Sequence, residues 1–418
     1  MSRLAAFRLP AIGLVLWAAP LVAADWCGFR GPGGTGFSGE TGLPTTWSAT
    51  ENVAWKTELP GPGASSPIII GDKVLVTCFR GAGTSSLARV LVCADRASGK
   101  ILWTKEVAAK SNEDRYGGQL TSHGYASSTP ISDGDKVFVF YGKSGVLAYD
   151  LAGNDLWQAD VGSGSAPMGW GSGTSPTLYK NLVIVNAGAE SEALVALDKS
   201  TGKQAWRADS GSLSMCWGSP IIVTSADGRD DLVLCVPQEI WGFNPETGKL
   251  RWYCDGIAEN AMCTSVVSKD GVVYAIGGRR GGAVAVKAGG RGDVNKDVVW
   301  RKSVGSYVTS PVIVGEHLYW VSDNGTACCL KLIDGETVFR ERIAGGGQLY
   351  GSVTAADGKL FAFTRNSGAA VIAAEPAFKQ LAHNKLDGDA GTFNSTPAVH
   401  QGQLLVRSDE YLYCLGQK

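Results

Sequence analysis

Seven large side chains stand just before steps of the Ser-Pro or Thr-Pro type, and they are the first residues in this sequence that could bind a ligand. They are Tyr125, Trp170, Trp217, Met262, Tyr307, Tyr350 and Phe393. Aromatic rings can stack on a sugar, a quinone or an aromatic side chain of a partner. Arg279, Arg365 and His123 are further candidates in neighbouring loops. The alternative interpretation is that the seven large side chains only fill space.

Two other patterns resemble cofactor or metal sites, and each has a structural explanation. The adjacent Cys328 and Cys329 occupy a segment that other copies of the repeat predict as a strand, where cysteine packs as a small apolar residue. Asp293, Asn295 and Asp297 match the start of a calcium loop, but the glycine and the glutamate that such a loop needs further on are absent. We therefore expect no metal site.

The histidines and cysteines show no spacing typical of metal ligands. His317 and His400 fall in predicted turns, so we expect both to be exposed. Ten cysteines in an exported protein would allow disulfides, and the pair that we consider is Cys216 with Cys263.

A repeated unit must position the candidate residues. Its opening step is Ser66-Pro67, Thr129-Pro130, Ser175-Pro176, Ser219-Pro220, Ser265-Val266, Ser310-Pro311, Ser352-Val353 or Thr396-Pro397. Each opening is followed by short segments of alternating apolar and polar residues, which predict half-buried strands. Most repeats then contain a turn and a tryptophan, as in the segment from Ala196 through Thr201-Gly202-Lys203 to Trp206. Four short antiparallel strands per repeat predict a propeller blade.

Eight openings predict an all-β, eight-bladed propeller of four-stranded antiparallel blades. The chain ends soon after Leu415, without a closing tryptophan strand for the last blade. A tryptophan strand without a blade of its own surrounds Trp55, near the N-terminus. We therefore expect this N-terminal strand to complete the last blade, which would leave no free sheet edge. The large side chains would then surround the mouth of the central channel. The 23-residue stretch 104–126, the longest connection, would overhang the same face.

The pattern Ala-x-Asp-x-x-Thr-Gly-Lys-x-x-Trp resembles the PQQ-type β-propeller repeat. Quinoprotein alcohol dehydrogenases share this repeat with the lipoprotein subunit of the outer-membrane β-barrel assembly machine. The opening stretch 26–32 and the stretch 289–294 look like those of exported bacterial members of the group. The resemblance covers nearly all of residues 26–418. It implies the propeller fold, whereas the activity must be argued from the site.

The N-terminus predicts export. Arg3 and Arg8 precede or flank an apolar run that ends in small residues at Ala24, as in a secretory signal peptide. We expect a signal peptide at 1–24, an extended segment at 25–51 and the propeller at 52–418, in the periplasm or secreted. An uncleaved N-terminal anchor is the alternative. No later segment is apolar enough over its length to cross a membrane.

Charge and composition limit the classes of partner that the protein can bind. The chain has 38 basic and 39 acidic residues, so it lacks the basic excess of a nucleic-acid binder. We expect a monomeric, non-catalytic binding or scaffold protein without a cofactor, whose channel mouth takes a protein or a glycan. The alternative is a quinoprotein alcohol dehydrogenase that uses PQQ and Ca²⁺. For that activity the resemblance implies oxygen ligands for Ca²⁺ and a carboxylate base in the channel, together with long loops that this shorter chain lacks.

Overall fold

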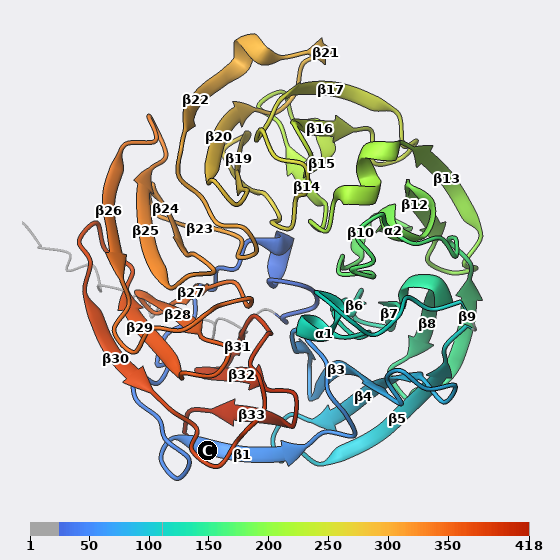
Figure 1. The fold of residues 1–418 in the computed structure, drawn as a ribbon, viewed down its shortest axis with the longest axis vertical. Helices are drawn as coiled ribbons and strands as arrows, with labels where there is room; N and C mark the ends of the chain where they lie inside the picture. The colour runs from blue at the N-terminus through green and yellow to red at the C-terminus, as the bar shows by residue number, and fades with distance from the viewer. Residues whose placement is uncertain (1–24, 111, 418) are drawn as a thin grey trace, which may run out of the picture.

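A computed structural model describes residues 25–110 and 112–417, and it shows eight antiparallel sheets arranged around a central channel (Figure 1). The predicted all-β, eight-bladed propeller is thereby confirmed. The predicted signal peptide lies outside the described residues. No helix within the described ranges is long and apolar enough to cross a membrane.

Blades 1 to 4 each fold from consecutive strands. Blade 1 contains β2 (Ile68–Ile70), β3 (Lys73–Arg80), β4 (Ala88–Asp95) and β5 (Ile101–Ala108). Blade 2 contains β6 (Ile131–Ser132), β7 (Lys136–Phe140), β8 (Val146–Asp150) and β9 (Asp155–Ala159). Blade 3 contains β10 (Thr177–Tyr179), β11 (Leu182–Ala187), β12 (Ala193–Asp198) and β13 (Gln204–Asp209). Blade 4 contains β14 (Ile221–Thr224), β15 (Asp230–Val236), β16 (Glu239–Phe243) and β17 (Leu250–Asp255).

Blades 5 to 8 complete the circle. Blade 5 contains β18 (Val267–Lys269), β19 (Val272–Gly277), β20 (Gly282–Lys287) and β22 (Val298–Lys302), while the short β21 (Gly292–Asp293) pairs with β17 of blade 4. Blade 6 contains β23 (Val312–Val314), β24 (His317–Val321), β25 (Thr326–Lys331) and β26 (Thr337–Arg342). Blade 7 contains β27 (Thr354–Ala356), β28 (Lys359–Phe363), β29 (Ala369–Ala373) and β30 (Gln380–Asn384). Blade 8 contains β31 (Ala398–His400), β32 (Gln403–Arg407) and β33 (Tyr411–Leu415), and its outer strand is the N-terminal β1 (Val53–Glu58).

The burial of each strand follows its position in the blade. The first strand lies at the channel and the fourth at the circumference (Figure 1). In blade 1 the inner strand β4 is almost continuously buried, because both of its faces pack against neighbouring blades. The outer strand β5 alternates between half-buried and exposed residues. The alternation in the sequence therefore describes the outer strands best.

Tryptophans on the outer strands join neighbouring blades, as a large apolar wedge should. Five of them donate an Nε1 hydrogen bond of 2.7–3.3 Å to a backbone carbonyl in the turn of the next blade: Trp55, Trp103, Trp157, Trp206 and Trp300. In blade 4 the turn residue Gly248 has φ +69°, and a Cβ there would lie 2.4 Å from the ring of Trp206. Glycine thus serves both the left-handed turn and the close contact with the indole ring.

The tryptophan of blade 4 packs differently. Trp252 is fully buried in its own blade and donates to the carboxylate of Asp231 at 2.8 Å. The same carboxylate pairs with Arg229 and Arg251. Asp293, which resembles the first position of a calcium loop in the sequence, lies here in β21, which runs along the edge of β17. Within the described part of the chain, no cluster of His, Cys, Asp or Glu could hold a metal ion.

The N-terminal segment 25–51 crosses the face opposite the channel mouth. Its backbone binds blades 1, 2 and 7 through hydrogen bonds from Ile69 to Trp26, from Ser132 to Cys27 and from Ala355 to Gly36. The guanidinium of Arg30, which is fully buried, donates to the Pro311 carbonyl of blade 6. The segment includes the 3₁₀ turn η1 (Pro32–Gly34), which Figure 1 shows at the centre of the propeller. The channel is therefore closed at this end.

Several local predictions need correction. Strand β5 continues to Ala108, so the long connection begins at residue 109 rather than at 104. All ten cysteines are free thiols, and Cys216 instead lies near the carbonyl of Cys235. His400 is buried because residues 40–42 of the N-terminal segment cover its turn, and His317 is half-buried. The expectation for Cys328 and Cys329 is confirmed, since both are buried in β25.

Candidate functional site

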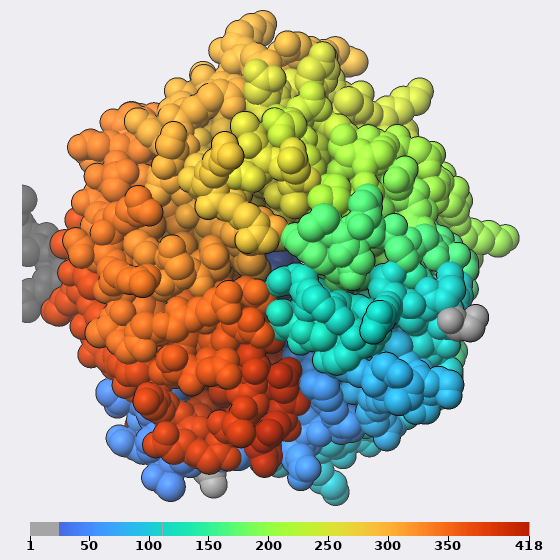
Figure 2. Space-filling model, in the orientation of Figure 1, coloured from blue at the N-terminus to red at the C-terminus, as the bar shows by residue number. Residues whose placement is uncertain are grey.

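A cavity of about 150 Å³ opens at the centre of the propeller face that carries the blade-to-blade loops. Figure 2 shows a hollow at this place, with atoms of the blue N-terminal segment at its bottom. Its walls include Trp170, Trp217, Tyr307 and Tyr350, and Phe29 lies among its lining residues. Phe29 also lines a second cavity of about 240 Å³ on the side of the N-terminal segment. Phe29, Ser219 and Ser265 line both cavities and lie between them, and we call the upper cavity the mouth pocket.

The aromatic walls pack against one another. The ring centroids of Trp170 and Trp217 are 4.7 Å apart, and the ring of Tyr307 meets Trp170 edge-on at 6.4 Å. The Nε1 of Trp217 donates to the Gly171 carbonyl at 2.8 Å, which fixes the orientation of the indole. The pocket therefore presents preformed aromatic surface to a ligand.

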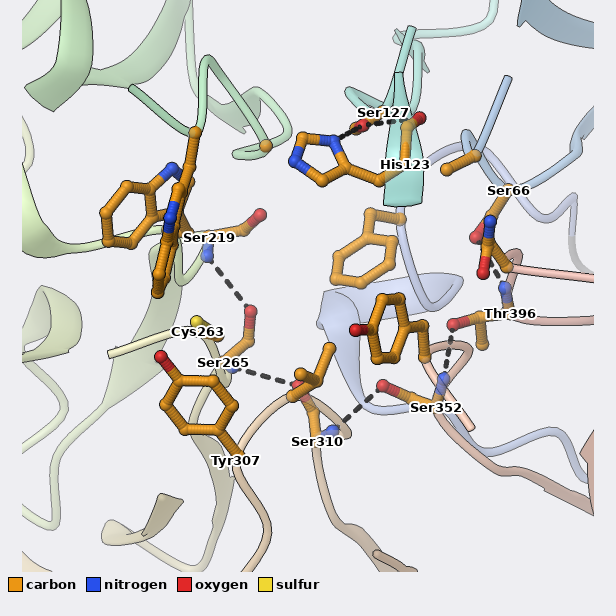
Figure 3. A pocket seen from close by; sticks show the side chains of 18 of the residues that line it. Ser66, His123, Ser127, Ser219, Cys263, Ser265, Tyr307, Ser310, Ser352 and Thr396 are labelled. Atoms are coloured by element: carbon orange, nitrogen blue, oxygen red, sulfur yellow. Dashed lines mark hydrogen bonds between the residues drawn. The ribbon is translucent and has the colours of Figure 1, made fainter. Parts of the chain in front are cut away.

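A closed ring of hydroxyl groups surrounds the channel at the level of the pocket, and Figure 3 shows the part of the ring that lines the pocket. At every blade opening, the backbone N–H of the Ser or Thr donates to the hydroxyl oxygen of the next opening at 2.8–3.0 Å. In order, the ring contains Ser66, Thr129, Ser175, Ser219, Ser265, Ser310, Ser352 and Thr396. All of these except Thr129 and Ser175 line the mouth pocket. The opening step thus places one hydroxyl per blade at the channel.

The connection between β5 and β6, here called the strap (109–110 and 112–130), reaches over the mouth. Two buried ion pairs hold its base: Arg89 binds Glu113 with two hydrogen bonds of 2.8 Å, and Lys143 binds Asp114 at 3.0 Å. These four side chains are at most 10% exposed. Loss of one partner would leave a buried charge uncompensated, so the ion pairs fix the strap in place.

The far end of the strap binds blades 7 and 8. It contains the short helix α1 (Leu120–His123), and the Ser122 carbonyl there accepts hydrogen bonds from Arg365 and Asn394. Gln119 donates to the Tyr350 hydroxyl at 3.0 Å. The strap therefore spans the mouth from blades 1 and 2 to blades 7 and 8.

The mouth pocket is uncharged. Among the residues that the structure describes, no Asp, Glu, Lys or Arg lines it. Burial lowers the pKa of His123 to about 4, so its imidazole is neutral at neutral pH, and it lies 2.6 Å from the Ser127 hydroxyl. Burial also raises the pKa of Cys263 to about 12, so this thiol stays protonated. The pocket can therefore recognise a ligand by stacking and hydrogen bonds but not by ion pairing.

Seven of the ten predicted site residues gather at this pocket. His123, Trp170, Trp217, Tyr307 and Tyr350 line it. Arg279 lies 4.1 Å from the ring centre of Tyr307, and Arg365 lies 4.3 Å from that of Tyr350. These cation–π contacts hold the two tyrosine rings in place, although the arginines themselves do not line the pocket.

The other three predicted residues lie away from the pocket. Met262 is fully buried between blades 4 and 5, because its backbone forms a β-bridge with Cys216 that directs it into the core. Tyr125 packs on Phe79 within the strap region. Phe393 packs against Phe363 and Tyr413 of blades 7 and 8. A position before the opening step is therefore not sufficient to reach the channel.

The hydroxyl ring and Phe29 are not among the predicted site residues. The repeated Ser or Thr of each opening marks the ring in the sequence, but by itself it predicts only the repeat. Phe29 lies outside the repeat, so no spacing indicated its place. Gln119, Ser127, Cys263 and Asn394 also line the pocket without having been predicted.

The lining residues do not fit PQQ and Ca²⁺. Calcium takes several oxygen ligands, carboxylates foremost among them, and no carboxylate lines the pocket. PQQ is a polycarboxylate, and no cationic side chain is present among the lining residues to pair with it. A cavity of roughly 150 Å³ holds about one benzene-sized ring, whereas PQQ has fused rings. We therefore derive no step through this cofactor.

Comparisons with known proteins agree on the fold. Among solved structures, BamB from Moraxella catarrhalis has a TM-score of 0.63 at 13% identity, over 88% of this chain and 97% of that chain. The computationally designed Ika8 protein has a TM-score of 0.57 at 12% identity, over 86% of this chain and 98% of that chain. A europium-containing methanol dehydrogenase has a TM-score of 0.50 at 12% identity, over 84% and 89%. Identities this low show the fold alone.

The sequence itself matches one family. A comparison with curated proteins finds no match. The family model described as outer membrane protein assembly factor BamB matches residues 4–165 and 89–341, which together exceed half of the chain. Repeat, fold and family model agree, and this chain belongs to the BamB family of PQQ-type β-propellers.

Proposed function

We propose that this chain is an exported, non-catalytic binding protein whose mouth pocket holds one ring-sized, uncharged group of a larger partner. The observation that carries the proposal is the pocket itself, which is closed below, uncharged and walled by aromatic side chains. Its volume of about 150 Å³ suits a single ring. A protein could supply that ring as a side chain, and a glycan could supply it as a sugar.

Three further observations support this proposal. The family model is described as an assembly factor, which is consistent with a scaffold that binds other macromolecules. The apolar N-terminal run and its small residues at 22–24 support export. The exposed Met168, which stands two residues before Trp170, adds apolar surface beside the mouth for a larger partner.

A capture experiment tests the proposal. Cell-envelope extract or glycan beads would be incubated with the purified protein and with the triple variant Trp170→Ala, Trp217→Ala and Tyr350→Ala. We expect the triple variant to lose at least about tenfold in capture, since buried aromatic contacts dominate such interfaces. The matched control is Tyr253→Ala, an exposed aromatic residue on the outer strand β17. Capture that is equal for all three proteins would overturn the proposal.

A further inference from the structure

The ring hydroxyls at the mouth pocket have protons to donate. Each hydroxyl oxygen accepts one backbone N–H, as described above, so its position is fixed. Among the described residues, none accepts a hydrogen bond from the six ring hydroxyls that line the pocket. A hydroxyl in this state can still donate its proton and accept through its second lone pair. The pocket therefore contains a converging set of neutral donors.

Asn394, which also lines the pocket, has a hydrogen-bond acceptor without a partner among the described residues. The side-chain amide of Asn394 donates through Nδ2 to the Ser122 carbonyl at 2.9 Å. Its Oδ1 is buried and has no hydrogen-bond partner within the described chain. The Tyr350 hydroxyl accepts from Gln119, which leaves the proton of that hydroxyl available. A ligand that satisfies this pocket must therefore both accept and donate hydrogen bonds.

We propose that the ring held in the mouth pocket is a neutral hexose ring. This inference rests on the proposed function and names its ligand class. A pyranose offers an apolar C–H face for the indole of Trp170 and hydroxyls that match Ser310 and Asn394. An aromatic side chain would fill the space but would leave the buried polar atoms unpaired, which is costly. A carboxylate or phosphate would be desolvated without a counter-charge.

The binding test uses the purified full chain and small probes. Glucose, galactose, mannose and N-acetylglucosamine would be titrated by saturation-transfer NMR, with phenol and acetate as competing classes. We expect at least one hexose to bind with a Kd on the order of millimolar, as small ligands of this size do, and acetate not to bind. If phenol binds and no hexose does, the hexose inference fails while the proposed function stands. If no probe binds, both fail.

A matched pair of serine variants tests the hydrogen-bond argument. Ser310 and Ser175 are equally buried, and each accepts one ring hydrogen bond, from Ser265 at 2.9 Å and from Thr129 at 3.0 Å. Only Ser310 lines the pocket. We expect Ser310→Ala and Ser175→Ala to lower the melting temperature alike, but only Ser310→Ala to weaken hexose binding, by about three- to tenfold. Equal affinities of the two variants would overturn the inference.

Discussion

The two ends of the central channel are built from different parts of the chain. At the mouth, loops of successive repeats and the strap leave a pocket walled by partly buried aromatic rings such as Trp170 and Tyr350. At the other end, a single non-repeated segment closes the channel with the fully buried Trp26 and Arg30. The difference teaches that the repeat loops and the strap provide the binding surface, while the N-terminal segment closes the channel. We therefore expect substitutions at the closed end to act on stability and those at the mouth to act on binding.

The largest expected effect is at the closed end. Trp26 is 1% exposed, and its ring lies against Gly31. Trp26→Ala should lower the free energy of unfolding by about 3–5 kcal/mol, because it removes a large buried side chain and leaves a cavity. Denaturant titration measures the loss. The half-buried Trp170→Ala at the mouth is the control, and an equal loss in both variants would contradict the contrast between the ends.

A buried acid should make the mouth end sensitive to pH. Glu190 accepts a hydrogen bond from Ser172, and burial raises its pKa to about 7. An unfolded glutamate titrates near pH ~4.3, so the folded chain binds this proton more tightly. The resulting stability is complete below about pH 4.3 and is lost as the pH rises through about 7, by roughly 3 kcal/mol.

The test compares unfolding free energies at pH 5 and pH 8. Glu190→Gln, whose side chain stays neutral, should be no more stable than the wild type at pH 5. Relative to the wild type, its free energy of unfolding should be higher at pH 8 than at pH 5. The exposed neighbour Glu192→Gln is the matched control and should follow the wild type. Parallel curves for Glu190→Gln and the wild type would show that this carboxyl does not titrate as described.

Removal of the Phe29 side chain should make the two ends of the central channel less distinct. Phe29→Ala should join the mouth pocket to the second cavity, because Phe29 is the largest of the three residues that line both. We expect a modest destabilisation of about 1–2 kcal/mol, since Phe29 is only half-buried, and tighter binding of a two-ring probe such as 2-naphthol. Tryptophan fluorescence follows the titration. Phe37→Ala, an exposed phenylalanine of the same segment, should leave naphthol binding unchanged. Unchanged affinity in Phe29→Ala would argue against a partition.

The smallest expected effect is the one from adding PQQ and Ca²⁺. Titration with PQQ and Ca²⁺ should give no saturable binding, because the lining residues supply neither carboxylate ligands nor cationic partners. Isothermal titration calorimetry measures this, with a PQQ-dependent alcohol dehydrogenase as the positive control. Stoichiometric binding would favour the dehydrogenase alternative over the binding protein.

The sequence predicted the parts of the molecule that repeat. Alternation along β5 and the turn at Gly202 with its tryptophan recur often enough to define the blades, because each blade must solve the same packing problem. The rim positions of Trp170 and Trp217 followed from that register. Met262 shows the limit of this reasoning: counted from its opening step it aligns with the buried Cys216, with which it forms a β-bridge, whereas Cys263 aligns with Trp217 and lines the pocket.

The contacts of the parts that do not repeat could be established only from the structure. Phe29 and Arg30 contact blades that are distant in sequence, and no local pattern predicts which blade they reach. The burial of His400 has the same origin, since the N-terminal segment covers it. Asn394 lines the pocket for a similar reason, because its side chain is held by the Ser122 carbonyl of the strap. The buried ion pairs of Arg89 and Lys143 in turn fix the course of the strap.

The hydroxyl ring has a sense of rotation. Every N–H in it points from one blade to the following blade, and the last of them, from Thr396 to Ser66, returns to the start. The in-plane components of eight bond dipoles arranged head to tail around a circle cancel, unlike the aligned dipoles of a helix. Recognition there rests on the individual O–H groups and not on charge, so we expect affinity at the mouth to change little with salt.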